Sequence, residues 1–252
     1  MAAGVNVFCI NLPHETGRRD RMRAQADAAR LDLVFVPAVH GSELSEPFAA
    51  YGCGASRARV AKRIMPRNEI ACFFSHRRAL QRFLASDAAY GLVLEDDVAI
   101  DPARRWQALD RLDWIDDRLP AAMGHPAPGG PPTIRCGGHS IAGTTSPSAA
   151  ASKCISGAQA LRYNREGAER VLARTDRFWL PFDIQLGRNW ESGLRILEIT
   201  PFPVALTQLP STIGHEGKPS WPQPTLGAKL AHLRWQVGGE LARRAMVLGQ
   251  CP

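Results

Sequence analysis

The sequence predicts an α/β protein whose N-terminal half is built on a parallel sheet. Apolar runs at Val5 to Ile10 and Leu33 to Val36 flank a segment of helical periodicity that begins at Thr16. Strand, helix and strand at this spacing form a βαβ unit, in which the two strands are parallel. A third apolar run, residues 90–94, ends in three adjacent acidic residues. Ligands of open α/β sheets bind outside the carboxyl ends of the strands, so we expect the functional site at these acids.

The three acids are Glu95, Asp96 and Asp97. Neighbouring carboxylates repel one another and raise one another's pKa, and a bound divalent cation removes that cost. Carboxylate oxygens suit hard cations such as Mg2+ or Mn2+. The cluster therefore indicates a metal site, although a solvated acidic turn after a strand would give the same pattern.

A strong helix is predicted from Asn68, as its N-cap, to about Ser86. Glu69 in the first turn favours the helix dipole. His76 falls on the same face as the apolar residues of this helix. A histidine on an apolar stripe is either a packed core residue or a member of a site, and the pattern alone leaves both open.

The second half of the chain has a weaker pattern. Residues 119–153 are rich in Pro, Gly, Ala and Ser and predict a loop, acting as a lid or a tolerated insertion. A strand at 154–161, a helix at 166–173 and a strand at 194–199 follow. Asp183 opens a short helix in an apolar context, where it could equally serve as an N-cap.

The last segment predicts an amphipathic helix over 226–248, with Gly238 and Gly239 breaking or kinking it at a cost of roughly 1 kcal/mol each. Its leucines recur along one side and its basic residues lie elsewhere. Packing on the domain and contact with an anionic membrane surface are both compatible with this pattern.

Composition sets wider limits. The 252 residues suffice for one large domain or two small ones, and the net charge of +7 with a pI near 9.4 favours anionic partners. No apolar run reaches the roughly 20 residues that span a bilayer, and residues 1–7 do not resemble a secretion signal. We expect a cytoplasmic protein, and the six cysteines, which form no CxxC pair, fit that expectation.

Four motifs in order resemble glycosyltransferase family 25, which comprises lipopolysaccharide and lipooligosaccharide biosynthesis glycosyltransferases. They are Ile10-Asn-Leu12, Thr16-Gly-Arg-Arg19, Asn68-Glu-Ile-Ala-Cys-Phe-Phe-Ser-His76 and Leu94-Glu-Asp-Asp97. Downstream, residues 180–183 and 190–194 also resemble the family. Asn68 and Ala71 stand where the family usually has glycine, and the 119–153 segment has no clear counterpart.

The resemblance implies a GT-A type fold, in which a Rossmann-like nucleotide-binding half and an acceptor-side half share a mixed central sheet. It implies one catalytic domain over 1–217, with a donor-binding half at 1–110 and an acceptor half at 154–217, followed by a basic helical segment at 218–252. The activity would be inverting transfer of a hexose, galactose or glucose, from a UDP-sugar to a saccharide or lipid-linked saccharide of a surface glycan.

The same resemblance assigns roles to residues. With this activity, Mn2+ or Mg2+ would be held by Asp97 and Glu95, and we add the late-chain His215 as a further ligand. We choose Asp183 as the general base, because it is a carboxylate of the second half in an apolar context that could raise its pKa. The donor would contact Asn11, Leu12, Arg18, Arg19, Glu69, His76, Glu95 and Asp96. For Arg18 and Arg19 a solvated helix face is the plain alternative.

Two other functions remain open from sequence. A metal-dependent phosphohydrolase or nuclease would use the same acids, although a second acidic cluster for a second metal is not evident. A basic nucleic-acid-binding protein would use residues 18–23 and 57–67, but the aromatic residues are not interleaved with the basic ones and no recognition motif is present. We therefore expect no nucleic-acid partner.

Overall fold

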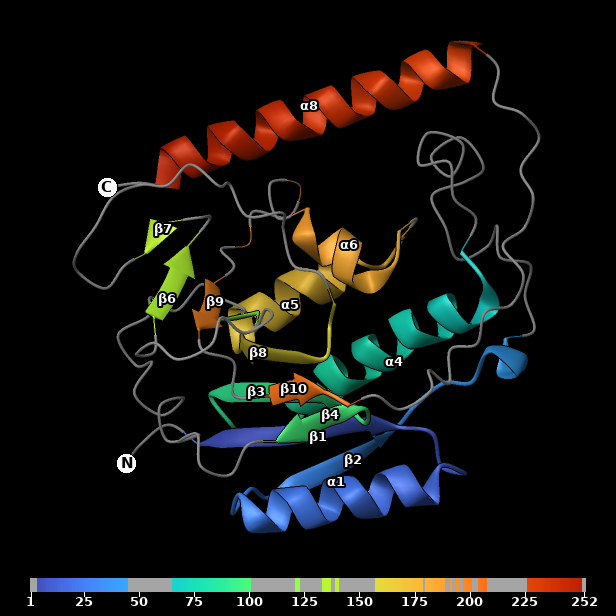
Figure 1. The fold of residues 1–252 in the computed structure, drawn as a ribbon, viewed down its shortest axis with the longest axis vertical. Helices are drawn as coiled ribbons and strands as arrows, with labels where there is room; N and C mark the ends of the chain where they lie inside the picture. The colour runs from blue at the N-terminus through green and yellow to red at the C-terminus, as the bar shows by residue number, and fades with distance from the viewer. Residues whose placement is uncertain are drawn as a thin grey trace.

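The computed structural model describes residues 4–44, 65–100, 121–122, 133–136, 139–140, 157–178, 180–188, 191, 194, 197–200, 204–207 and 226–250. Their centre is an eight-stranded sheet in the order β2-β1-β3-β8-β5-β9-β6-β7, and β10 and β4 form a separate pair (Figure 1). Parallel and antiparallel neighbours both occur in the large sheet. The predicted α/β class with a mixed central sheet is confirmed.

The N-terminal half contains the predicted βαβ unit. β1 (Val5–Asn11), α1 (Thr16–Ala28) and β2 (Leu33–Pro37) follow one another, and β1 pairs in parallel with β2 and with β3 (Tyr90–Glu95). A short 3-10 turn, η1 (Gly41–Glu43), follows β2, and β4 (Val98–Ile100) follows the acidic turn. The chain thus brings the ends of β1 and β3 side by side.

The long helix of this half is α4 (Arg67–Leu84), and its N-cap is Pro66, not Asn68 as predicted. Proline presets the extended φ of a cap residue, so the helix begins before Asn68 and places that side chain inside the first turn. Glu69 lies in the first turn, as predicted.

The second half adds antiparallel strands to the same sheet. β8 (Ala160–Asn164) pairs with β3, and α5 (Arg165–Arg174) and α6 (Phe182–Gly187) follow it. β9 (Leu197–Thr200) and β10 (Val204–Leu206) come next. Residues 154–156 of the predicted strand lie outside the described residues, and the described strand begins later, at Ala160.

The predicted loop at 119–153 contains three short strands, so that prediction is wrong for the part of the segment that the structure describes. They are β5 (Ala121–Ala122), β6 (Thr133–Cys136) and β7 (His139–Ser140). β5 and β6 both pair with β9, which lies about 60 to 75 residues later in the chain. Pairing between such distant segments is invisible to local composition.

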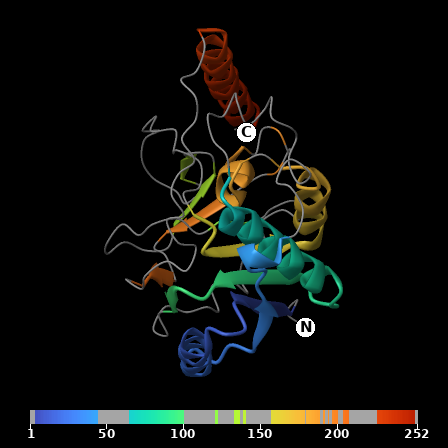
Figure 2. The ribbon, with the colours of Figure 1, turned by 90° about the vertical axis from the view of Figure 1, so that its right-hand side faces the viewer.

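Alternation along β1 and β3 divides the interior into two cores. Phe8 and Val93 face α4, α5 and α6, whereas Cys9 and Leu92 face α1 and the β4–β10 pair. Figure 2, turned by 90° from Figure 1, shows α1 and α4 on different sides of these strands. The sheet is therefore the middle of three layers.

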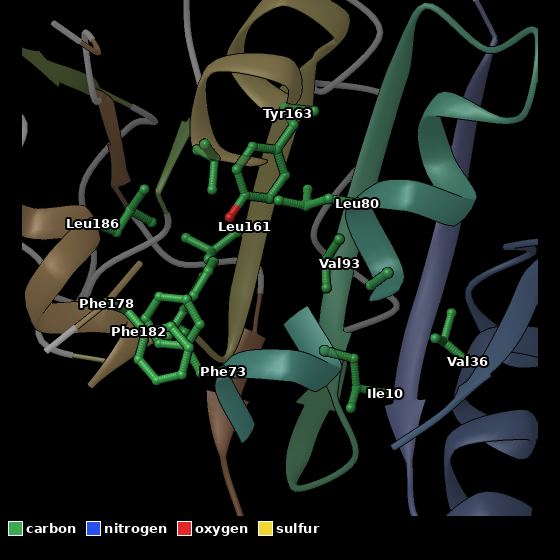
Figure 3. Close-up of a cluster of buried hydrophobic side chains, with 14 of the residues drawn as sticks. Ile10, Val36, Phe73, Leu80, Val93, Leu161, Tyr163, Phe178, Phe182 and Leu186 are labelled. Atoms are coloured by element: carbon green, nitrogen blue, oxygen red, sulfur yellow. The ribbon is translucent and has the colours of Figure 1, made fainter. Parts of the chain in front are cut away.

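The core beside α4 ends in a group of aromatic rings. Phe73 of α4 stacks on Phe178 at 3.8 Å between ring centroids and meets Phe182 of α6 edge-on at 5.2 Å. Figure 3 shows these three rings gathered together. These rings join α6 to α4, the helix that also carries His76.

Position 91 in β3 has no room for a side chain, so substituting Gly91 should lower the stability of the protein. A Cβ on Gly91 would lie 2.5 Å from Cγ of Phe83, a fully buried residue. Gly91→Ala is expected to destabilise the protein by roughly 1–3 kcal/mol through overpacking, measured by chemical denaturation. Gly17→Ala is the matched control, because a Cβ there meets nothing within 4 Å. A Gly91→Ala stability equal to that of the control would contradict the packing.

The C-terminal helix α8 (Leu226–Gln250) is a single helix through Gly238 and Gly239, so of the two predicted outcomes, a kink or a break into two helices, the break is wrong. Gly239 is buried, whereas a Cβ at Gly238 would meet nothing within 4 Å. A helix can pass through glycine where tertiary contact offsets the propensity cost. Among the described helices, none is both long and apolar enough to cross a membrane.

Candidate active site

A pocket lies at the carboxyl ends of β1 and β3. Ile10 pairs with Glu95 across these parallel strands, so the loop after β1 and the acidic turn after β3 meet at one edge of the sheet. The pocket encloses about 640 Å³ of space, a figure that includes open solvent. It is lined by Ile10, Leu12, Arg18, Ala38, Val39, His40, Gly41, Asn68, Ala71, Cys72, Ser75, His76, Glu95, Asp96 and Asp97.

Asp96 is held on both carboxylate oxygens. Asn11 Nδ2 donates to Oδ2 at 2.8 Å, and Arg18 Nη1 donates to Oδ1 at 2.8 Å. Arg21 Nη2 also donates to the backbone carbonyl of Asp96. Charge-assisted hydrogen bonds of this kind are strong and directional. Asp96 therefore anchors the acidic turn to β1 and α1, and its oxygens are already engaged.

Asp97 is the acid with unused capacity. Its Oδ1 is buried and has no hydrogen-bond partner among the described residues. Burial, then the negative charges of Glu95 and Asp96, raise the pKa of Asp97 to about 6, against a smaller lowering by Arg18. Thr207 fixes the Asp97 carbonyl, its backbone N donating at 2.8 Å and its Oγ1 at 2.6 Å. A cation beside Oδ1 would relieve both the unmet hydrogen bond and the crowding of charge.

The Oδ1 atom of Asn11 is a second buried oxygen that has no hydrogen-bond partner in the described part of the chain. Its amide nitrogen is the group that holds Asp96. Carbonyl and carboxylate oxygens together form the donor chemistry that Mn2+ and Mg2+ prefer. The residues present thus fit a hard divalent cation.

Glu95 lies at the other side of the acidic turn, against His76. Their Nε2 and Oε1 atoms are 3.0 Å apart, and the Glu95 side chain is 23% exposed. His76 is buried and stacks on Phe182 of α6 at 4.4 Å between ring centroids. The two interpretations of His76 therefore hold together, since it is packed in the core and also forms a wall of the pocket.

Cys72 completes a second cluster one helical turn before His76. Ligand atoms of Cys72, His76 and Glu95 lie within 4.8 Å of one another. Burial, followed by the charges of Glu95 and Asp183, raises the pKa of the Cys72 thiol well above its usual value. The thiol is therefore protonated without a cation, and a sulfur–nitrogen set of this type favours Zn2+ over Mg2+.

Five of the eight predicted donor-binding residues line the pocket, and Asn11, Arg19 and Glu69 do not. Asn11 instead holds Asp96 through a hydrogen bond. Arg19 places its guanidinium 4.6 Å from the centroid of the Phe35 ring and does not line the pocket. Glu69, in the first turn of α4, does not line it either. His215 lies outside the described residues.

Sequence reasoning missed His40, Asn68, Ser75 and Cys72 as pocket residues. His40 follows β2, whose carboxyl end lies at the same sheet edge as those of β1 and β3. The strand-end rule that pointed to Glu95 would have pointed to His40 as well. Ser75 is one residue before His76 and supports the loop after β2, because its Oγ accepts from Val39 N at 2.8 Å.

Asp183 does not line the pocket, but its charge acts on Cys72, which does. Its Oδ2 accepts a hydrogen bond from the backbone N of Gly157 at 3.1 Å, and its charge contributes to the raised pKa of Cys72. Gly157 has φ of +100°, a conformation that favours glycine. Pro181, not Asp183, is the N-cap of α6, so the capping alternative for Asp183 is wrong and its side chain contacts Gly157 instead.

Comparisons with known proteins agree with the motifs. Residues 5–110 match the profile of "Glycosyltransferase family 25 (LPS biosynthesis protein)". A glycosyltransferase 25 family member of Anopheles gambiae is 34% identical over 108 residues, which are 41% of this chain and 18% of that protein. Procollagen galactosyltransferase 2 of Homo sapiens is 29% identical over 119 residues, 44% of this chain and 18% of that protein. The chain matches only about a fifth of the length of these relatives.

A crystal structure of a glycosyltransferase involved in the glycosylation of the major capsid of PBCV-1 is similar at a TM-score of 0.33 and 11% identity, covering 68% of this chain and 66% of that one. This likeness is too remote to establish more than the profile does. The matched segment contains β1, α1, β2, α4 and β3, and with them every residue that lines the pocket. The resemblance seen in the ordered motifs is confirmed: residues 5–110 are similar in sequence to glycosyltransferase family 25.

Proposed function

We propose that this protein is a metal-dependent, inverting glycosyltransferase that moves a hexose, galactose or glucose, from a UDP-sugar to a saccharide acceptor of lipopolysaccharide or another surface glycan, on the cytoplasmic side of a membrane. The observation that supports this best is the acidic turn after β3, which closes a pocket formed within the family 25 segment. One relative over that segment is named for galactosyl transfer, which favours a hexose.

The donor would enter between the loops that follow β1 and β2. Leu12 and His40 line this side of the pocket, and Arg18 offers positive charge next to Asp96. Glu95 remains partly exposed and can accept hydrogen bonds from ribose or sugar hydroxyls. Asp96 would act as a positioning residue, because its oxygens are engaged by Asn11 and Arg18.

The cofactor would be Mn2+ or Mg2+, held by Asp97 and Glu95, with His215 as a further ligand. When bound, the cation would neutralise the diphosphate that leaves the sugar. The buried, unpartnered Oδ1 of Asp97 is the feature that supports this ligand set.

The general base would be Asp183, supplied by the second half of the chain. Its charge contributes to the raised pKa of the Cys72 thiol, and Cys72 lines the pocket. The Gly157 contact engages Oδ2. A carboxylate oriented by one backbone hydrogen bond can still accept the proton of an acceptor hydroxyl with its other oxygen.

The structure gives little support to nucleic-acid binding through the arginines of α1. Arg18 and Arg21 are directed at Asp96, and Arg19 and Arg23 lie over the ring of Phe35. The basic start of α1 is therefore engaged within the fold instead of forming an open phosphate-binding surface. Residues 57–64 lie outside the described residues.

A panel of nucleotide sugars tests the proposal. Thermal melting is measured with UDP-, GDP- and CMP-sugars, with Mn2+ and with EDTA. A ligand at about 100 times its Kd adds about 2.7 kcal/mol, which for a chain of this size raises Tm by roughly 5–10 °C. We expect UDP-sugars to produce this rise only with Mn2+. No shift with any nucleotide sugar would contradict the proposal.

Arg18 and Arg19 provide a matched pair for the same assay. Arg18→Ala is expected to remove the UDP-sugar shift, because Arg18 lines the pocket and anchors Asp96. Arg19→Ala is expected to keep it, since Arg19 lies over Phe35. Equal effects of the two substitutions would indicate binding elsewhere on α1.

A further inference from the structure

We propose that α8 docks the protein on an anionic membrane surface, with one apolar stripe inserted at the level of the lipid headgroups. The stripe consists of Leu226, Leu230, Leu233, Val237 and Leu241, whose exposed fractions are 74, 50, 55, 51 and 61%. This inference does not depend on the proposed transferase activity, because it rests on a different part of the fold.

The stripe is continuous and faces away from the protein. At about 100° per residue, its five members fall within roughly a quarter of the helix circumference. Among the described residues, Ile184 is the one exposed large hydrophobic residue outside it. Figure 1 shows α8 along the edge of the molecule opposite α1, and Figure 2 agrees. An exposed apolar face of this length marks an interaction site.

The opposite face of α8 attaches the helix to the domain. Trp235 lies about half a turn around the helix from Leu226, and its ring receives the Arg188 guanidinium at 4.5 Å from the centroid. Gly239, near the same side, is buried. The helix is thus held by its aromatic side, which leaves the leucine stripe outermost.

Charge favours a lipid surface as the occupant. Lys229 and Arg234 are exposed and lie on the two edges of the stripe. The helix contains four basic residues, Lys229, Arg234, Arg243 and Arg244, against one acidic residue, Glu240, for a formal charge of 4 − 1 = +3 in a chain of +7. Basic groups beside an inserted apolar face are attracted to anionic headgroups. A second copy of α8 would instead oppose like charges.

Vesicle sedimentation with the full chain tests the docking. Vesicles of phosphatidylcholine alone are compared with vesicles containing about one third phosphatidylglycerol, at low and high salt. We expect binding to the anionic vesicles at least tenfold stronger, and weakened by salt. Leu230→Gln/Leu233→Gln/Val237→Gln is expected to reduce that binding at least tenfold while leaving Tm nearly unchanged, because these side chains are exposed.

Ile184→Gln is the control, since it removes an exposed apolar residue outside α8 and should keep vesicle binding. The proposal is overturned if the wild-type chain ignores anionic vesicles, or if the triple variant still binds them. It is also overturned if the triple variant melts much earlier, which would place the stripe in a core. If the wild-type chain sediments as a dimer and the triple variant as a monomer, the stripe is instead an interface with a second copy.

Discussion

Asp97→Asn is expected to abolish Mn2+-dependent binding of UDP and, in the same variant, to raise the melting temperature of the metal-free protein above pH 6. The loss of binding and the gain in stability both result from removing the negative charge of Asp97. Asp97 is partly buried among Glu95 and Asp96, where its negative charge is costly without a cation and useful with one. Asparagine keeps the shape and removes the charge.

The sign follows from the pKa. Asp97 has a folded pKa of about 6 against an ordinary value of 3.8, so between these values the folded state binds more protons than the unfolded state. Stability therefore falls as pH rises through this window, and the penalty is complete above about 6. Protons and cations also compete for Asp97, so Mn2+ affinity should fall about tenfold per pH unit below that pKa.

Calorimetric titration and thermal melting measure both effects. UDP affinity with Mn2+ should fall by at least about 100-fold, since even outer-sphere partners of metal ligands are worth about 10- to 100-fold. Asp96→Asn is the control, because it disturbs the bond from Arg18 and should lower Tm, not raise it. Unchanged Mn2+-dependent affinity in Asp97→Asn would remove Asp97 from the metal site. If the wild type binds Zn2+ and Cys72→Ser does not, the cation site is the cluster of Cys72, His76 and Glu95.

Asp183→Asn is the substitution expected to affect turnover most. Transfer should slow by roughly 10²- to 10⁴-fold, the usual contribution of a positioned base. UDP-sugar affinity and Tm should barely change, because the asparagine Oδ1 can still accept the hydrogen bond from Gly157 N. The measurements are the transfer rate, donor affinity and thermal melting of one variant.

Asp183→Ala separates catalysis from anchoring. It removes the acceptor for Gly157 as well as the charge, so Tm should fall only in this variant. Near-wild-type transfer in Asp183→Asn would leave Asp183 with an anchoring role alone. Glu191 would be the next carboxylate to consider, although it already forms an ion pair with Arg188 at 2.7 Å. A collapse of donor affinity would instead place Asp183 in the sugar pocket.

Local patterns predicted the N-terminal half well because its elements are consecutive. The βαβ unit joins neighbouring segments, and the rule for strand ends brings the β1 loop and the acidic turn together. The pattern did not divide roles among the acids. Asp96 and Asp97 are adjacent in sequence, yet one is held by Asn11 and Arg18 and the other keeps a buried free oxygen, a difference set by three-dimensional packing.

Other features depended on contacts that local sequence does not encode. Arg18 and Arg19 differ by about 100° around α1, and only the packing of α1 on the sheet directs the first to Asp96 and the second to Phe35. The strands of two to four residues in the Pro- and Gly-rich segment exist through pairing, β5 with β8 and β9, β6 with β9, and β7 with β6. The donor-half and acceptor-half boundaries stay a prediction.

The most direct test of the central claim is the release of UDP from the UDP-sugar that stabilises the protein most, followed with and without Mn2+ for the wild type and Asp97→Asn. Glycosyltransfer at this site predicts slow release to water that requires Mn2+, accelerates when a saccharide acceptor is added, and falls at least about 100-fold in the variant. Release that is independent of Mn2+ and equal in the two proteins would contradict it.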